Sequence, residues 1–496
     1  MNAAEILLSA GADAAIAIEC GERRVSYAEL RDRVRRAAGA WQALGLAPGE
    51  RVVVFAPDSD DWVEAYLGAI WAGGVVIGVN PRLSMTELTP ILKECEARFV
   101  WCEPAQAGEL QGLVATLPGA PAVVGGGVAA RDWAQALAGA EGLEPMQLDA
   151  EAPALWIGTS GTTGTPKGVI HVQRVVANAH SFACSLAGLT SADRLYASSK
   201  LFFAYALGNS LFAGLRAGAT VILDREWPTA ERVEEMVAKH RPTLLFSVPT
   251  LYNKMLQTGV AARLAERGIR HFVSAGEALP LAIRQGWREQ TGCSLISGYG
   301  TSETLCLMLY SDDDSGLMRP TPLTEVRFNP DVDADLPQRI WVRHTTVAVG
   351  YWKRPEAQVD FDNGWFSPGD MFLRHADGRL EYAGRNDDML KIAGQWVSTL
   401  WVEQALAAHC GDTLQQIAAV GVDSADGLTA LAVLVVAAPG RWAEARQRVE
   451  DGIAALPGHR RPRWVHWVDA LPLTPTGKLQ RGRLRALHER HAAAAA

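Results

Sequence analysis

Short apolar runs alternate with amphipathic segments of helix length along the first 300 residues, and this alternation limits the chain to few fold classes. Residues 51–56 and 75–79 have the length and apolar character of buried strands. Residues 27–44, 60–72 and 86–95 instead repeat apolar side chains at helical spacing. Strands that alternate with helices in this way predict βαβ units, and therefore a parallel sheet covered by helices.

The alternation continues after residue 200. Strands are predicted at 219–223, 244–248, 271–274 and 294–296, with a helix at 229–240. Two intervening regions are predicted differently. Residues 108–142, rich in Ala and Gly, are expected to form a variable surface region with one strand at 122–124, and residues 172–187 are predicted to be a single helix.

Past residue 310 the character of the sequence changes. Residues 311–337 are crowded with Asp and Pro, and short strands are predicted at 325–328 and 339–343, which suggests a small, mainly β subdomain. Residues 381–393 break the pattern again and form a candidate hinge. The segment after the hinge predicts a small α/β domain, with helices at 399–408 and 442–455 and strands at 418–422, 428–437 and 464–468.

A chain of 496 residues is too long for one hydrophobic core, so at least two domains are expected. We place an N-terminal ATP- and acyl-binding domain at residues 1–386, a mobile C-terminal domain at 387–487 and a tail at 488–496. The predicted fold class is α/β. Parallel or mixed sheets layered with helices and a small β subdomain make up the large domain, and the small domain is α/β.

Composition excludes several classes of protein. The net charge of −8 provides no basic field for nucleic acid. The seven cysteines lack Cys-x-x-Cys spacing, which is typical of a reducing cytoplasm without disulfides or a zinc site. No export signal is apparent, and the longest apolar segment, residues 430–438, is too short to span a bilayer. We therefore expect a cytoplasmic protein with neither a nucleic-acid nor a membrane partner; its oligomeric state is left open.

A ten-residue stretch, which we call the phosphate loop, follows the apolar run at residues 154–157. It contains three glycines, five hydroxyl side chains and one lysine: Thr159, Ser160, Gly161, Thr162, Thr163, Gly164, Thr165, Pro166, Lys167 and Gly168. Glycines let a backbone approach a polyphosphate, while hydroxyls, amides and one cation bind its oxygens. The alternatives are a solvated surface loop and the P-loop of NTPases. The P-loop requires Gly-Lys-Ser/Thr at the start of a helix, whereas here Pro166 precedes Lys167.

A second glycine-containing stretch follows the predicted strand at 294–296 and consists of Gly298, Tyr299, Gly300, Thr301, Ser302 and Glu303. Its glycines permit a tight bend, its tyrosine offers a planar face to a base, and its carboxylate suits a phosphate-bound Mg²⁺. By itself this stretch could be only a turn. Together with the phosphate loop, it indicates a nucleotide site.

These two stretches resemble the nucleotide motifs of the adenylate-forming superfamily, which includes acyl-CoA synthetases, standalone adenylation domains and luciferases. The resemblance extends from about Ser26 to Leu487, with the motifs in the family's order. It implies that a carboxylate attacks the α-phosphate of ATP with Mg²⁺ present and that pyrophosphate leaves. Coenzyme A, as a substrate, then attacks the acyl-adenylate and releases AMP.

The resemblance also implies roles for individual residues. It assigns Lys478 to catalysis, Glu303 to catalysis and the metal, Asp387 to the hinge, and Gly394, Gln395 and Trp396 to the loop that faces the site during thioester formation. Two half-reactions over one site give a domain rotation its purpose. The implied ATP-binding residues are Thr159, Ser160, Gly161, Thr162, Thr163, Gly164, Lys167, Gly276, Glu277, Gly298, Tyr299, Gly300, Thr301, Ser302, Asp370 and Arg385, of which the resemblance assigns the last two to the ribose.

The aromatic segment at residues 200–209 is similar to the benzoate-CoA ligase branch of this superfamily, although core packing is the alternative explanation for such a stretch. The implied acyl pocket consists of Phe203, Tyr205, Ala275, Cys306 and Leu307. That branch commonly has a His-Ile pair where this chain has Cys306-Leu307, so the sequence leaves the ring substituents open. The predicted function is an ATP-dependent aryl carboxylate-CoA ligase.

Three alternative functions remain at this point. An aryl-acid adenylating enzyme would load a carrier-protein phosphopantetheine, a nucleotide sensor would lack ligase activity, and a P-loop hydrolase would release ADP. Residues 441–490 contain eleven Lys or Arg against five acids. This segment is either a set of solvated helix faces or a basic surface for CoA phosphates or an acidic carrier protein.

Overall fold

The computed structural model describes residues 1–125, 131–160, 166–329, 336–392, 395–424, 428–473 and 479–495. The chain divides into two compact units. The large unit contains residues 1–327 and 341–368, and the small unit contains residues 328–340 and 369–496. In the described parts of the chain, no helix combines the length and the apolar character that crossing a bilayer requires.

The first sheet of the large unit has nine strands in the order β15-β14-β13-β12-β11-β9-β10-β1-β2. The strands from β13 to β1 in this order run parallel, whereas β2, β14 and β15 pair antiparallel. Their bounds are β1 Ile16–Cys20, β2 Arg23–Ser26, β9 Arg194–Ala197, β10 Thr220–Leu223, β11 Leu244–Ser247, β12 His271–Ser274, β13 Leu295–Tyr299, β14 Leu309–Ser311 and β15 Arg319–Pro320.

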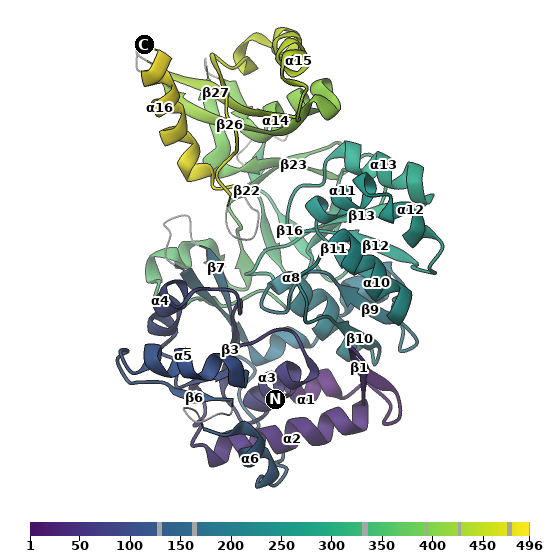
Figure 1. The fold of residues 1–496 in the computed structure, drawn as a ribbon, viewed down its shortest axis with the longest axis vertical. Coiled ribbons are helices and arrows are strands. Elements are labelled where there is room, and N and C mark those ends of the chain that lie inside the picture. The colour runs from purple at the N-terminus through teal and green to yellow at the C-terminus, as the bar shows by residue number, and fades with distance from the viewer. Residues whose placement is uncertain are drawn as a thin grey trace. The chain divides into compact units, whose positions relative to one another are not determined.

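Four helices cover one face of this sheet: α10 Ala230–His240, α11 Pro249–Gln257, α12 Val260–Ala265 and α13 Leu281–Thr291 (Figure 1). They bury Trp287, Tyr252 and Met236 against Leu245 and Phe272 of the strands. The strands and helices predicted between residues 219 and 296 are therefore confirmed. Burial on both faces explains why these parallel strands are continuously apolar.

The second sheet has seven strands in the order β19-β8-β7-β4-β3-β5-β6. Strands β7, β4, β3, β5 and β6 are parallel, while β8 pairs antiparallel with β7 and with β19. The strand bounds are β3 Arg51–Phe55, β4 Val75–Gly78, β5 Phe99–Cys102, β6 Ala122–Val124, β7 Pro153–Ser160, β8 Pro166–Val172 and β19 Gly350–Tyr351. Helices α2 Tyr27–Ala43, α3 Asp60–Trp71, α4 Met85–Cys95 and α5 Pro104–Val114 accompany it.

Two predictions for the large unit are wrong. Residues 172–187 do not form one helix: β8 extends to Val172, a 3₁₀ turn follows at Gln173–Val176, and α7 spans only Ser181–Leu186. The β-branched valines favour the strand, and the Gln173 side chain accepts a hydrogen bond of 2.7 Å from the Ala3 amide, which fixes the turn.

The second wrong prediction concerns residues 108–142: the strand at 122–124 is confirmed as β6, but the region also contains helices. Helix α5 begins at Pro104, a residue suited to a first helical turn, and a further helix, α6, spans Trp133–Ala138. The Trp133 ring packs 4.7 Å from the Trp41 ring. Burial of that tryptophan orders a segment whose composition alone indicates none.

A four-stranded antiparallel sheet, β16-β18-β21-β20, completes the large unit and confirms the predicted β subdomain. Its strands are β16 Glu325–Arg327, β18 Trp341–Arg343, β20 Phe361–Asp362 and β21 Trp365–Phe366. The single strand predicted at 339–343 is divided in two. Strand β17, Gln338–Arg339, pairs instead with β22 in the small unit.

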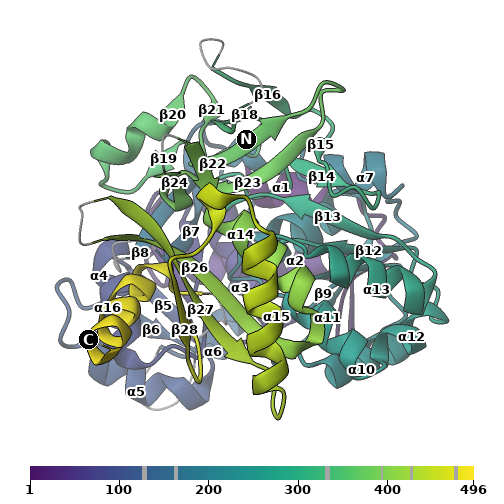
Figure 2. The same ribbon diagram turned by 90° about the horizontal axis from the view of Figure 1, so that it is seen from above.

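The small unit holds the sheet β17-β22-β23, the hairpin β24-β25 and the sheet β26-β27-β28. Helices α14 Thr399–Cys410 and α15 Trp442–Ala455 cover one face of the last sheet, and α16, Leu484–Ala495, packs on the other (Figure 2). The strand bounds are β22 Asp370–Arg374, β23 Leu380–Arg385, β24 Met389–Ile392, β25 Gln395–Ser398, β26 Leu414–Asp423, β27 Thr429–Ala437 and β28 Trp464–Trp467. This arrangement confirms the predicted small α/β fold.

Candidate nucleotide and acyl site

The carboxyl ends of parallel strands β9, β11, β12 and β13 lie at one edge of the nine-stranded sheet. Three predicted site segments begin there: residues 198–209 follow β9, residues 275–277 follow β12, and residues 300–307 follow β13. Ligands of open α/β sheets bind outside this edge. The topology therefore brings together segments that are about 100 positions apart in the sequence.

Two glycines let the second nucleotide motif fold back on the segment that follows it. A Cβ atom at Gly298 would lie 2.4 Å from Cδ1 of Leu307, and one at Gly300 would lie 2.7 Å from the carbonyl oxygen of Cys306. Neither distance leaves room for a side chain. The predicted acyl residues Cys306 and Leu307 therefore pack directly against the predicted nucleotide residues.

Glu303 and Lys167 both contact the side chain of Tyr351. The Tyr351 hydroxyl donates a hydrogen bond of 2.7 Å to Oε1 of Glu303, and Nζ of Lys167 lies 5.4 Å from the centroid of its ring. Tyr351 reaches this position because β19 pairs with β8, placing Tyr351 opposite Val169. Sequence reasoning missed Tyr351, which lies 48 positions from Glu303.

The chemistry of Glu303 suits a magnesium ion that is shared with phosphate. Within the described residues, no group of three or more His, Cys, Asp or Glu side chains is arranged to hold a metal by itself. Mg²⁺ bound through one carboxylate takes its remaining ligands from substrate phosphates and water. Glu303 fits that mode of binding, since it is partly exposed beside the one cation of the phosphate loop.

His171, a residue that sequence reasoning missed, ties the second sheet to the nucleotide motif. Its Nε2 donates a hydrogen bond of 2.8 Å to the carbonyl oxygen of Ser302. The ring is fully buried, and burial lowers the pKa of His171 to about 4. The imidazole is therefore neutral at physiological pH and acts as a fixed donor that positions Ser302.

The predicted acyl residues gather around a core of aromatic rings. The Phe203 ring lies 4.4 Å from that of Phe202, and the Tyr205 ring meets Phe246 edge-on at 6.1 Å. The Tyr205 hydroxyl donates to the carbonyl oxygen of Val273 at 2.9 Å, so it is fixed to β12. Burial raises the pKa of Tyr205, which keeps the phenol protonated.

The predicted ribose residues meet within the small unit. Asp370 and Arg385 are register partners on the antiparallel strands β22 and β23. Asp370 is buried, and its Oδ1 accepts a hydrogen bond of 3.2 Å from the Tyr382 hydroxyl. This arrangement holds a carboxylate and a guanidinium side by side, as binding to vicinal hydroxyls requires.

Comparison with known protein families shows to which family this chain belongs. Residues 9–352 match the family described as AMP-binding enzyme, and residues 401–478 match the AMP-binding enzyme C-terminal domain. The chain belongs to the AMP-binding enzyme family. The predicted membership of the adenylate-forming superfamily is thereby confirmed.

Similar proteins place the chain in the benzoate-CoA ligase branch of the AMP-binding enzymes. It is 39% identical to a 3-hydroxybenzoate–CoA ligase of Aromatoleum sp. (strain CIB), over 98% of this chain and 97% of that protein. It is 33% identical to a benzoate–CoA ligase of Thauera aromatica, over 93% and 90% of the two chains.

Solved structures agree with the placement in this branch. The benzoate CoA ligase from Burkholderia xenovorans LB400 is 31% identical and superimposes with a TM-score of 0.85, over 98% of this chain and 100% of that one. The anthranilate CoA ligase AuaEII in complex with anthranoyl-AMP is 28% identical and gives a TM-score of 0.90, over 99% and 98%.

Several predicted residues of this AMP-binding enzyme cannot be placed. Gly161, Thr162, Thr163, Gly164, Gly394 and Lys478 lie outside the described residues, as do the side chains of Ser160 and Asp387. Thr159, at the end of β7, is the register partner of Lys167 on β8. Gln395 and Trp396 begin β25, and the Trp396 ring is 47% exposed, with Nζ of Lys391 6.0 Å from its centroid.

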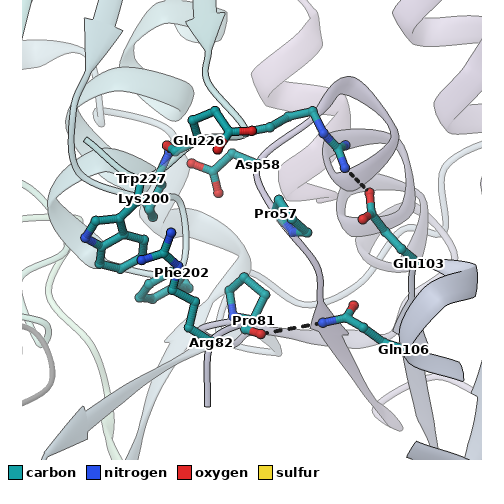
Figure 3. A pocket seen from close by; sticks show the side chains of 11 residues that line it. Pro57, Asp58, Pro81, Arg82, Glu103, Gln106, Lys200, Phe202, Glu226 and Trp227 are labelled. Carbon is teal, nitrogen blue, oxygen red and sulfur yellow. Dashed lines mark hydrogen bonds and ion pairs between the residues drawn. The ribbon is translucent and has the colours of Figure 1, made fainter. Parts of the chain in front are cut away.

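A cavity of about 350 Å³ in the large unit was not expected from the sequence (Figure 3). It is lined by Pro57, Asp58, Pro81, Arg82, Glu103, Gln106, Lys200, Phe202, Arg225, Glu226 and Trp227. The buried Asp58 carboxylate accepts hydrogen bonds from the Leu201 amide at 3.1 and 3.2 Å, and burial raises its pKa to about 7. Phe202 belongs both to this lining and, through its contact with Phe203, to the aromatic segment of the acyl site.

Proposed function

We propose that this protein is an acid–thiol ligase that converts an aryl carboxylate of the benzoate type into its CoA thioester through an acyl-adenylate. One observation carries the proposal. Relatives that are 33–39% identical over nearly the whole chain are named benzoate or hydroxybenzoate CoA ligases. The packing of the acyl residues against the nucleotide motif supports it, because both substrates of the adenylation step must meet at one place.

In this proposal, ATP lies along the carboxyl edge of the nine-stranded sheet. Lys167 faces the phosphates and Glu303 would hold the Mg²⁺ that accompanies them, while Tyr351 orients both side chains. The metal, when bound, neutralises charge on the phosphate oxygens. Tyr299, Gly276 and Glu277 bind the adenine, and Ser302, held by His171, meets the α-phosphate.

The small unit supplies the ribose-binding residues and, from residue 387 onward, the groups that change between the two half-reactions. Asp370 and Arg385 bind the ribose, and Lys478 stabilises the negative charge that builds on the α-phosphate as pyrophosphate leaves. The chain then turns at Asp387, so that Gly394, Gln395 and Trp396 replace Lys478 over the adenylate. The mobile domain in this scheme is residues 387–487.

Pyrophosphate release across a panel of carboxylates tests the proposed function. The panel contains benzoate, hydroxybenzoates, aminobenzoates, cinnamates and short fatty acids, each with ATP and Mg²⁺, with and without CoA. We expect rapid release with an aryl acid and an aryl-CoA product that appears only when CoA is present. Release that CoA does not accelerate would overturn the CoA ligase and favour transfer to a carrier protein. Absence of pyrophosphate release with every acid would overturn the proposed ligase activity altogether.

A further inference from the structure

A π-helical turn begins within the predicted aromatic segment at residues 200–209 and extends beyond it. Between α8, Ala204–Ala206, and α9, Ala213–Arg216, residues Leu207–Phe212 form a π-helix in which every residue is buried. π-Helical turns are rare and often occur at functional sites, because the wider turn redirects side chains. This turn contains one amide side chain, Asn209, which is 3% exposed.

Both ends of the Asn209 amide are bonded. Its Nδ2 donates to the carbonyl oxygen of Tyr205 at 3.0 Å, and its Oδ1 accepts from the Leu307 amide at 3.1 Å. Tyr205 and Leu307 belong to the two segments assigned to the acyl pocket. These segments are distant in the sequence, since one follows β9 and the other follows β13. Asn209 is thus a hydrogen-bonded bridge between those segments.

The backbone beside this bridge has no free space. A Cβ atom at Gly208 would lie 2.4 Å from the carbonyl oxygen of Leu305 and 3.1 Å from Sγ of Cys306. Leu305 itself has a φ of +61°, in the left-handed region that non-glycine residues avoid. The segment after Glu303 is therefore pressed onto the π-helix, and a small shift of Leu307 would move Cys306 with it.

We infer that Asn209 is a positioning residue that sets the distance between the Tyr205 and Leu307 sides of the acyl pocket, and thereby selects which ring substituents the enzyme accepts. The inference rests on the proposed aryl-CoA ligase function. Asn209 touches neither the acid nor ATP in this assignment. It acts through the two backbone segments that it joins.

A matched control is available at Thr321. Its Oγ1 donates to the carbonyl oxygen of the same residue, Leu307, at 3.0 Å, and it is equally buried. Thr321→Val removes one hydrogen bond to Leu307 without removing the bridge to Tyr205. Asn209→Leu removes both bonds of the bridge while keeping the number and branching of the side-chain heavy atoms, and Asn209→Ser provides a smaller polar side chain if the leucine variant does not fold.

The experiment measures kcat/KM for benzoate and for hydroxy- and aminobenzoates, together with KM for ATP and the melting temperature of each variant. For the Asn209 variants we expect the ratio of kcat/KM between the preferred acid and its analogues to change at least tenfold, with KM for ATP within twofold of wild type. Thr321→Val should keep the wild-type ratio.

Lowered melting temperature and activity with unchanged ratios in the Asn209 variants would indicate a purely structural role and overturn the inference. An equal change of ratio in Thr321→Val would overturn it as well. Failure of the wild-type enzyme to use any aryl acid would remove the proposed function and the inference with it. The wild-type panel, run first, distinguishes that outcome from failure of the inference alone.

Discussion

The hydroxyl of Tyr351 donates a 2.7 Å hydrogen bond to the carboxylate of Glu303, the residue assigned to magnesium. A hydrogen bond to a charged acceptor contributes about 1.5–3 kcal/mol, which corresponds to roughly tenfold or more in binding. Tyr351→Phe removes this bond but keeps the ring beneath Lys167. We therefore expect KM for Mg-ATP to rise about tenfold while KM for the aryl acid stays near the wild-type value.

Steady-state kinetics with varied Mg-ATP checks this prediction. Tyr351→Leu removes the ring as well and should raise KM for Mg-ATP further, since the contact with Lys167 is also lost. An equal KM for Mg-ATP in Tyr351→Phe and wild type would show that the hydrogen bond from Tyr351 to Glu303 does not contribute to binding of Mg-ATP.

Lys478→Ala should abolish most adenylation and leave ATP binding intact. An ammonium group that stabilises charge formed only in the transition state contributes to kcat rather than to ground-state affinity. We expect pyrophosphate release to fall by at least a hundredfold, with the ATP dissociation constant changed less than threefold. Lys239→Ala, which removes only a lysine paired with Glu22 on the large unit, is the control and should behave as wild type. Near-normal turnover in Lys478→Ala would remove the catalytic role.

Buried His171 should make the large unit less stable in acid. Its folded-state pKa of about 4 lies below the ordinary value of 6.5, so between these values the unfolded chain binds a proton that the folded chain does not. The stabilisation is fully present above about pH 6.5 and is lost as the pH falls toward 4, by about 3 kcal/mol in total. Hydrogen exchange of the β8 amides at pH 7 and pH 4.5 measures this loss.

His171→Gln separates titration from hydrogen bonding. The glutamine amide retains an N–H donor for the Ser302 carbonyl but binds no proton in this range. Its pH dependence of β8 stability should therefore be shallower than that of wild type. A slope equal to that of wild type would place the acid sensitivity on other groups.

Within the small unit, Arg481 and Glu403 form a two-bond ion pair. Nη1 and Nη2 of Arg481 donate to the two carboxylate oxygens, each at 2.8 Å, and Glu403 also accepts from the Ala419 amide at 2.7 Å. Arg481→Met leaves a buried carboxylate unpaired and should destabilise β26 by about 3 kcal/mol, measured by hydrogen exchange. Arg481→Met combined with Glu403→Leu should recover most of that loss, and a double variant as unstable as the single one would contradict the assignment.

Much of the fold could be predicted because its segments follow local periodicity. The strands at 51–56 and 244–248 and the helices at 27–44 and 442–455 occur where the apolar spacing places them. Local spacing failed at residues 172–187, where β8 extends to Val172 and a 3₁₀ turn at Gln173–Val176 replaces the start of the predicted helix. The hydrogen bond from the Ala3 amide to the Gln173 side chain joins residues 170 positions apart, so no local pattern could reveal it.

The candidate site was predictable only where a motif is contiguous. Glu303, Lys167 and Asp370 stand in recognisable runs, whereas the residues that support them do not. Tyr351 is 48 positions from Glu303, His171 is 131 positions from Ser302, and Asn209 is 98 positions from Leu307. Such partners are brought together by the topology of the sheets, which no single stretch of sequence contains.

The division of residues 339–343 between two sheets has a consequence for recombining this enzyme with its relatives. In a chimera joined at 368/369, β22 and its edge partner β17 would come from different parents. The edge of β22 would then lack the strand with which it pairs in this protein. A crossover at 386/387 falls between β23 and β24, which belong to different sheets, so it severs no strand ladder among the described residues. Chimeras joined at 386/387 should therefore be recovered as folded protein more often than those joined at 368/369.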